Sequence, residues 1–63
     1  MEIERENLKY SELTAYNVAL DIVIDTEGVA SYEVSVECYG GEVEYFEHDT
    51  EVEALETFKY FCD

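Results

Sequence analysis

The chain has 63 residues, 48% of them apolar and nine of them aromatic, which argues against a disordered acidic tail. A single domain over residues 1–63 is expected, with a small core, because a domain of this size buries only about 60% of its unfolded surface. Seventeen acidic residues against three basic ones give a net charge of −14, which disfavours binding to nucleic acid or to an anionic membrane.

The first dozen residues follow neither a helical nor a strand period. Their apolar members are irregularly spaced, at Ile3, Leu8, Tyr10 and Leu13. Because glutamate, arginine, leucine and lysine are strong helix formers, we expect a short N-terminal helix over Ile3–Glu12. A strand is the alternative.

Residues 14–26 alternate between apolar and polar side chains, as a half-buried strand does. The even positions carry Thr14, Tyr16, Val18, Leu20, Ile22 and Ile24, while Asn17, Asp21 and Asp25 stand at odd positions. A turn at Glu27 and Gly28 follows, because glycine accepts positive φ without steric cost.

A second strand is expected to present Tyr32, Val34, Val36 and Cys38 to the core and Ser31, Glu33, Ser35 and Glu37 to solvent. Gly40 and Gly41 predict a tight hairpin turn. In the third strand we expect Val43 and Tyr45 on the core face and Glu42 and Glu44 on the solvent face. Phe46 then falls on the acidic side.

After His48 the apolar period changes to that of a helix, expected over about residues 50–61. Its stripe consists of Val52, Leu55, Phe58 and Cys62. Thr50 and Glu53 match a capping box. The predicted fold is therefore α+β: a three-stranded antiparallel meander sheet with the C-terminal helix on one face and a short N-terminal helix.

The acidic residues of the strands suggest a surface function. Residues two apart on a strand lie about 6.6–6.8 Å apart on one face, close to two phosphate steps of about 3.4 Å. Such rows could imitate a nucleic-acid backbone and bind a basic protein. The expected partner-binding residues are Asp21, Asp25, Glu33, Glu37, Glu42, Glu44 and Phe46. Phe46, like Tyr39 and Tyr60, could serve as an aromatic anchor within the charged surface.

In size, acidity, lack of catalytic motifs and order of elements, the chain resembles small acidic phage-borne inhibitors. That group includes anti-CRISPR proteins and the DNA-mimic inhibitors of restriction enzymes and of uracil-DNA glycosylase. The similarity covers most of the chain but only as layout and charge, so no family site residue is transferred. The resemblance implies an inhibitor acting in a host cytoplasm, which occupies the nucleic-acid site of a basic protein such as a CRISPR effector.

Two other functions fit the same charge. A structural or interaction module, antitoxin-like or part of an assembly, could mask a basic partner without competing with nucleic acid. Its free sheet edges could also pair two copies into a homodimer. Alternatively, the charge could reflect a high-salt cytoplasm, where salt screens the repulsion.

Catalysis and cofactor binding are disfavoured by the sequence. His48 precedes a helix in a turn, and no serine or cysteine lies in a nucleophile motif. Cys38 and Cys62 are expected to be buried apolar side chains, because with His48 they lack the spacing of a zinc site. The first residues do not resemble a secretory signal, and no apolar run in the sequence approaches the roughly 20 residues that span a bilayer. We therefore expect a cytoplasmic location.

Overall fold

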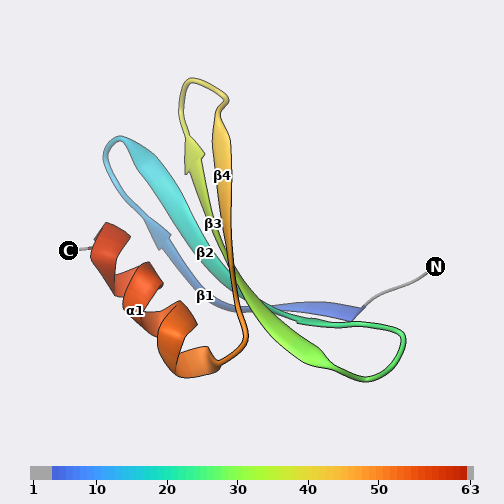
Figure 1. Cartoon of the computed structure of the whole chain (residues 1–63). Coiled ribbons are helices and arrows are strands. Elements are labelled where there is room, and N and C mark those ends of the chain that lie inside the picture. Colours follow the sequence, from blue (N-terminus) through green and yellow to red (C-terminus); the bar gives the residue numbers. More distant parts are fainter. Residues whose placement is uncertain (1–3, 63) are drawn as a thin grey trace.

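The computed structural model describes residues 4–62 and consists of an antiparallel sheet followed by one helix (Figure 1). Its elements are β1 (Glu4–Glu12), β2 (Tyr16–Ile24), β3 (Ala30–Cys38), β4 (Val43–His48) and α1 (Glu51–Cys62). The strand order β1-β2-β3-β4 is a meander. The α+β class and the C-terminal helix packed on an antiparallel sheet are therefore confirmed.

The predicted N-terminal helix is wrong: residues 4–12 form the edge strand β1, and Ile3 lies outside the described residues. A ten-residue helix without an apolar stripe is marginal in water, since isolated helices need about 12–15 residues or more. Pairing along β2 instead satisfies the backbone of this segment. The sheet thus has four strands and not three.

A β-bulge at Leu8 explains why β1 fits no simple period. Asn7 pairs with Asp21 and Lys9 with Leu20, which leaves Leu8 as an extra residue without a partner across the strand pair. Side chains that point to one face therefore change from even to odd positions at the bulge. Glu6 and Lys9 lie on the same face as α1, whereas Asn7 and Tyr10 lie on the other.

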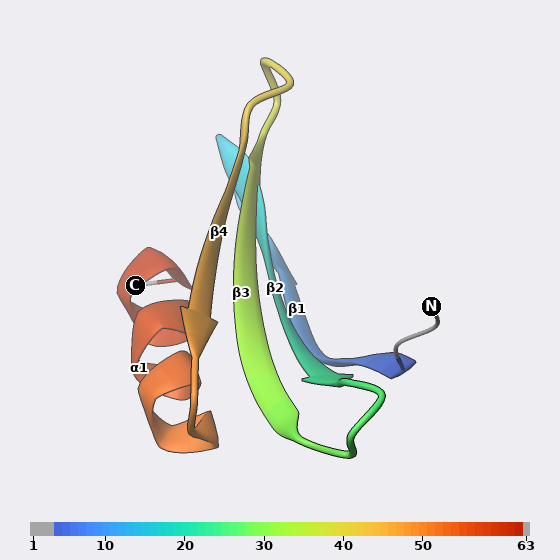
Figure 2. The ribbon, with the colours of Figure 1, turned by 45° about the vertical axis from the view of Figure 1, so that its right-hand side comes forward.

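Figure 2 shows α1 on one side of the sheet, and the core lies between the two. The even positions of β2 and β3 face the helix, as predicted. The helix does not use all of the predicted stripe: Val52 is 66% exposed, and Ala54 is buried in its place. The buried residues are Val18, Leu20, Val34, Val36, Ala54 and Phe58. Within residues 4–62, no helix is long and apolar enough to cross a membrane.

The orientation of β4 differs from the prediction. Val43 and Tyr45 lie on the face away from α1, while Phe46 pairs with Val34 and packs against the core. The cause is the turn before β4. Cys38 donates its N–H to the Glu42 carbonyl at 2.8 Å, which closes a loop of three residues, and Gly41 takes a φ of 100°.

A two-residue turn at Gly40 and Gly41 would have produced the predicted orientation. The extra residue in the loop shifts the pairing by one position, and such a shift moves every side chain of a strand to the opposite face. Glu44 accordingly pairs with Val36 on the helix side of the sheet.

The capping residue of α1 provides a test of this architecture. The Glu53 N–H donates to the Thr50 hydroxyl at 3.3 Å, and that hydroxyl donates to the Glu53 carboxylate at 3.1 Å. Replacing Thr50 with alanine removes both bonds and should lower the free energy of unfolding by about 1 kcal/mol in urea denaturation. Thr14→Ala, in the exposed β1–β2 turn, is the control, and equal losses in the two variants would contradict a capping role for Thr50.

Candidate protein-binding face

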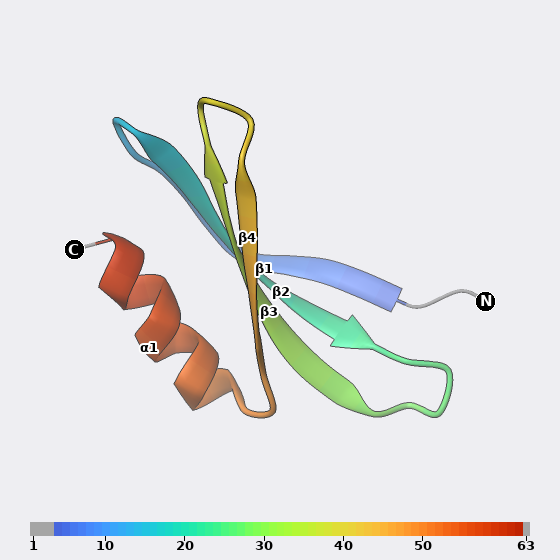
Figure 3. The same ribbon diagram turned by 45° about the horizontal axis from the view of Figure 1, so that its top comes forward.

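The sheet face turned away from α1 is not covered by any element of residues 4–62, as Figure 3 shows. We call it the open face. The pairing registers define its residues, which form rows across the four strands. Its members are Arg5, Asn7, Tyr10 and Glu12 of β1, Asn17, Ala19, Asp21 and Val23 of β2, Ser31, Glu33, Ser35 and Glu37 of β3, and Val43, Tyr45 and Glu47 of β4.

One row of the open face forms a shallow trough. Its residues are, in order across the strands, Tyr10, Ala19, Ser35 and Tyr45. The small side chains stand on the central strands and the tyrosines on the edge strands, where they are 57% and 63% exposed. The hollow between them has a volume of about 170 Å³, and Asn17, Glu37 and Val43 complete its lining. We call it the tyrosine trough.

Carboxylates flank the tyrosine trough on both sides. The neighbouring row contains Asp21, Glu33 and Glu47 on successive strands, and the row on the other side contains Glu12 and Glu37. Strands lie about 4.7–4.9 Å apart, so the first three acids repeat at roughly that spacing. The open face therefore presents five carboxylates around two exposed tyrosines.

One arginine lies among these carboxylates. Arg5 donates hydrogen bonds to Glu33 at 2.8 Å and to Asp21 at 3.0 Å, and Asn7 donates to Asp21 at 2.8 Å. The hydrogen bond to Glu33 raises the pKa of the Arg5 guanidinium; partial desolvation opposes it, and attraction to Glu33 and the contact with Asp21 add to the increase. Arg5 neutralises part of the row, while Glu47, Glu12 and Glu37 remain exposed.

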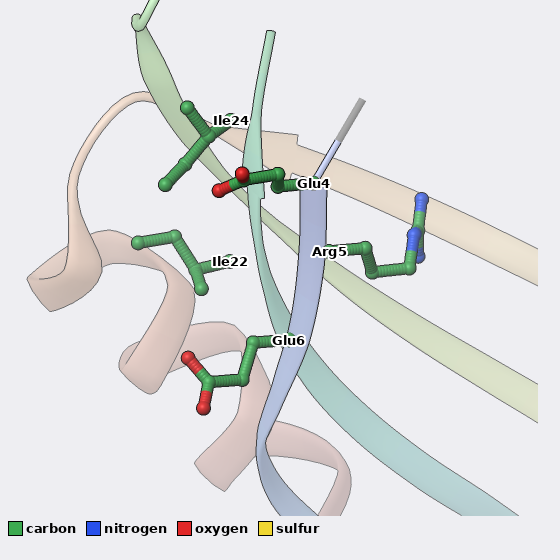
Figure 4. A pocket seen from close by; sticks show the side chains of 5 residues that line it. All are labelled: Glu4, Arg5, Glu6, Ile22 and Ile24. Atoms are coloured by element: carbon green, nitrogen blue, oxygen red, sulfur yellow. The ribbon is translucent and has the colours of Figure 1, made fainter. Parts of the chain in front are cut away.

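Figure 4 shows the alternation of β1 near this arginine: Glu4 and Glu6 point to the helix side with Ile22 and Ile24, and Arg5 points the opposite way. All five residues line a hollow of about 430 Å³. Only Arg5 of this group reaches the open face.

The sequence-predicted site is dispersed in the structure. Asp21, Glu33 and Glu37 do lie on the open face. Asp25 belongs to the β2–β3 turn, where its carboxylate accepts the N–H groups of Glu27 and Val29 at 2.9 Å. The remaining predicted residues lie elsewhere: Glu42 in the β3–β4 turn, and Glu44 and Phe46 on the helix side. The expectation that these acids form rows on one face of the sheet is therefore wrong.

Sequence reasoning missed five residues that supply charge or rings to the open face: Arg5, Tyr10, Glu12, Tyr45 and Glu47. The first three depend on recognising β1 as a strand with a β-bulge at Leu8, and the last two depend on the length of the β3–β4 loop. Tyr39, a suggested anchor, donates its hydroxyl to the Leu13 carbonyl at 2.8 Å, so it ties the β1–β2 turn to the neighbouring hairpin.

The residues considered for zinc have other surroundings. Among residues 4–62, no three His, Cys, Asp or Glu side chains gather as a metal site. His48 Nε2 lies 2.8 Å from the Thr57 hydroxyl and so joins β4 to α1. Cys38 and Cys62 are free and half-buried.

Comparison with family models, with curated proteins and with solved structures finds no match. Function is therefore inferred from the shape and charge of the molecule.

Arg5 should stabilise the sheet by relieving repulsion between Asp21 and Glu33. Arg5→Ala is expected to lower the free energy of unfolding by about 1 kcal/mol or less, because the arginine is partly exposed to solvent. Urea denaturation at low and high salt measures the effect, which should shrink as the Debye length falls from about 10 Å at 0.1 M to about 3 Å at 1 M. Lys59→Ala on α1 is the control, because it makes the same change in net charge. Equal losses of unfolding free energy in both variants would show that the position of the removed charge does not matter.

Proposed function

We propose that this protein is a non-enzymatic acidic inhibitor that binds the nucleic-acid-binding surface of a basic protein through its open face. The observation that carries the proposal is the uncovered sheet face with five carboxylates, one arginine and two exposed tyrosines. A surface of this charge attracts basic partners and speeds their association.

The open face supports a particular form of nucleic-acid mimicry. Its acids lie in rows across the strands, and three of them, Asp21, Glu33 and Glu47, repeat at about 4.7–4.9 Å on successive strands. The result is a two-dimensional array of negative charge beside aromatic rings. A nucleic acid likewise presents phosphates beside base rings, and single-strand sites use both charge and stacking. A groove rich in arginine and lysine therefore offers complementary contacts to this face.

The tyrosine trough supplies the apolar contacts that charge alone lacks. Exposed ion pairs contribute only about 0–1 kcal/mol each, whereas buried aromatic anchors account for much of the energy of protein interfaces. Tyr10 and Tyr45 stand at opposite edges of the face, above Ala19 and Ser35. A partner side chain that enters the trough meets an aromatic wall on each side and the Glu37 carboxylate in its lining.

The target class is a protein whose nucleic-acid groove is lined with arginine and lysine, of which a CRISPR effector is one example. A module that masks a basic partner away from its nucleic-acid site is the alternative function. Competition separates the two, because only the inhibitor displaces nucleic acid.

The test reverses charge at Glu37 and Glu47, which are exposed and make no contact with Arg5. A partner is first captured with the wild-type protein from nuclease-treated host lysate. Displacement of labelled nucleic acid from that partner is then followed by fluorescence anisotropy. The Glu37→Lys/Glu47→Lys variant should require at least about tenfold more protein for half-displacement, a loss of about 1.4 kcal/mol.

The matched control is Glu6→Lys/Glu27→Lys, which changes the net charge equally but lies off the open face. It should displace nucleic acid within about twofold of the wild type, apart from the general weakening that salt also produces. Equal losses in both double variants would show that net charge alone drives binding. Capture of a partner without displacement of its nucleic acid would favour the masking module instead.

A further inference from the structure

A third concave surface lies between β4 and α1, on the helix side of the sheet and thus on the opposite side from the open face. It has a volume of about 310 Å³. We call it the aromatic hollow, and its lining residues are Phe46, Glu56, Thr57, Tyr60 and Phe61.

The rings of the aromatic hollow are held in place before any ligand arrives. Phe61 lies 5.4 Å from Phe46 and 5.1 Å from Tyr60, measured between ring centroids. Its carbonyl accepts the Tyr16 hydroxyl at 2.5 Å, and both phenylalanines pack against the core. Tyr60 is 79% exposed. The hollow thus has two fixed aromatic walls and one ring open to solvent.

Glu56 gives this aromatic surface a negative charge. It precedes Tyr60 by four residues, so the two side chains share one face of α1. The only ion pairs among residues 4–62 are those of Arg5, which leaves Glu56 without a cationic partner there. The Thr57 hydroxyl already contacts His48, so the Glu56 carboxylate and the Tyr60 hydroxyl are the polar groups of the lining that remain available to a ligand.

We propose that the aromatic hollow binds an arginine side chain of a basic partner protein. A planar guanidinium can stack on the aromatic rings of the hollow and donate two hydrogen bonds to the Glu56 carboxylate. A lysine ammonium is more strongly hydrated and lacks the planar fork, so it gains less from the same surroundings. The negative charge of the chain complements the partner, and the proposal does not depend on nucleic-acid competition at the open face.

The test compares octa-arginine with octa-lysine, two peptides of equal charge, by calorimetric titration at about 0.15 M salt, where the Debye length is near 8 Å. The wild-type protein should bind octa-arginine about tenfold more tightly, equivalent to about 1.4 kcal/mol. Proton NMR should show shifts of the Phe46, Tyr60 and Phe61 rings with octa-arginine. Tyr60→Ala and, separately, Glu56→Gln should each reduce the preference to about twofold or less, while octa-lysine affinity stays within about twofold.

Val52→Ala is the matched control, because it shortens an exposed apolar side chain of α1 that lines neither the tyrosine trough nor the aromatic hollow. It should keep the arginine preference. The proposal is overturned if the wild type binds octa-arginine and octa-lysine equally tightly. That result would indicate that the hollow takes an apolar anchor instead. The proposal is equally overturned if Tyr60→Ala keeps the preference or Val52→Ala removes it. Failure of the open-face proposal is distinguishable, because Glu37→Lys/Glu47→Lys weakens both peptides alike and leaves their ratio unchanged.

Discussion

The three-residue loop before β4 is the constraint on which both proposed binding surfaces depend. Gly41 adopts a φ of 100°, which residues other than glycine rarely adopt. This conformation closes the hairpin with Cys38 opposite Glu42. The resulting register turns Phe46 towards the core and Tyr45 towards the open face. It also brings the end of β4 to the point from which α1 crosses the sheet. One backbone conformation therefore sets the core, the tyrosine trough and the aromatic hollow.

The small core must offset a large electrostatic repulsion. Six buried side chains stand against a net charge of −14, and a strong excess of one sign disfavours the compact state. The structure reduces the cost by spreading its acids over turns, helix and both sides of the sheet. Asp21 and Glu33 approach each other across strands, and Arg5 forms ion pairs with both of them. Exposed carboxylates that have no such relief gain most from a basic partner.

The elements that sequence alone predicted are those with an uninterrupted period. β2 and β3 alternate without a bulge, and α1 begins at a recognisable capping residue, Thr50. β1 was missed because the extra residue at Leu8 breaks its alternation, and its composition favours a helix. The orientation of β4 was missed because Gly40 and Gly41 fit a loop of two residues as well as one of three. Loop length changes the pairing, and composition does not reveal it.

The position of β4 at the sheet edge links the two surfaces. Tyr45 and Phe46 are adjacent in sequence but point to opposite sides of the sheet, one into the tyrosine trough and one into the aromatic hollow. The edge itself carries Glu42, Glu44 and Glu47, and like charges oppose pairing of two copies there. The same charges attract a basic chain. A partner with a cationic groove could therefore enclose this edge and contact both surfaces at once. Both surfaces would then contribute to binding, although the chain itself is small.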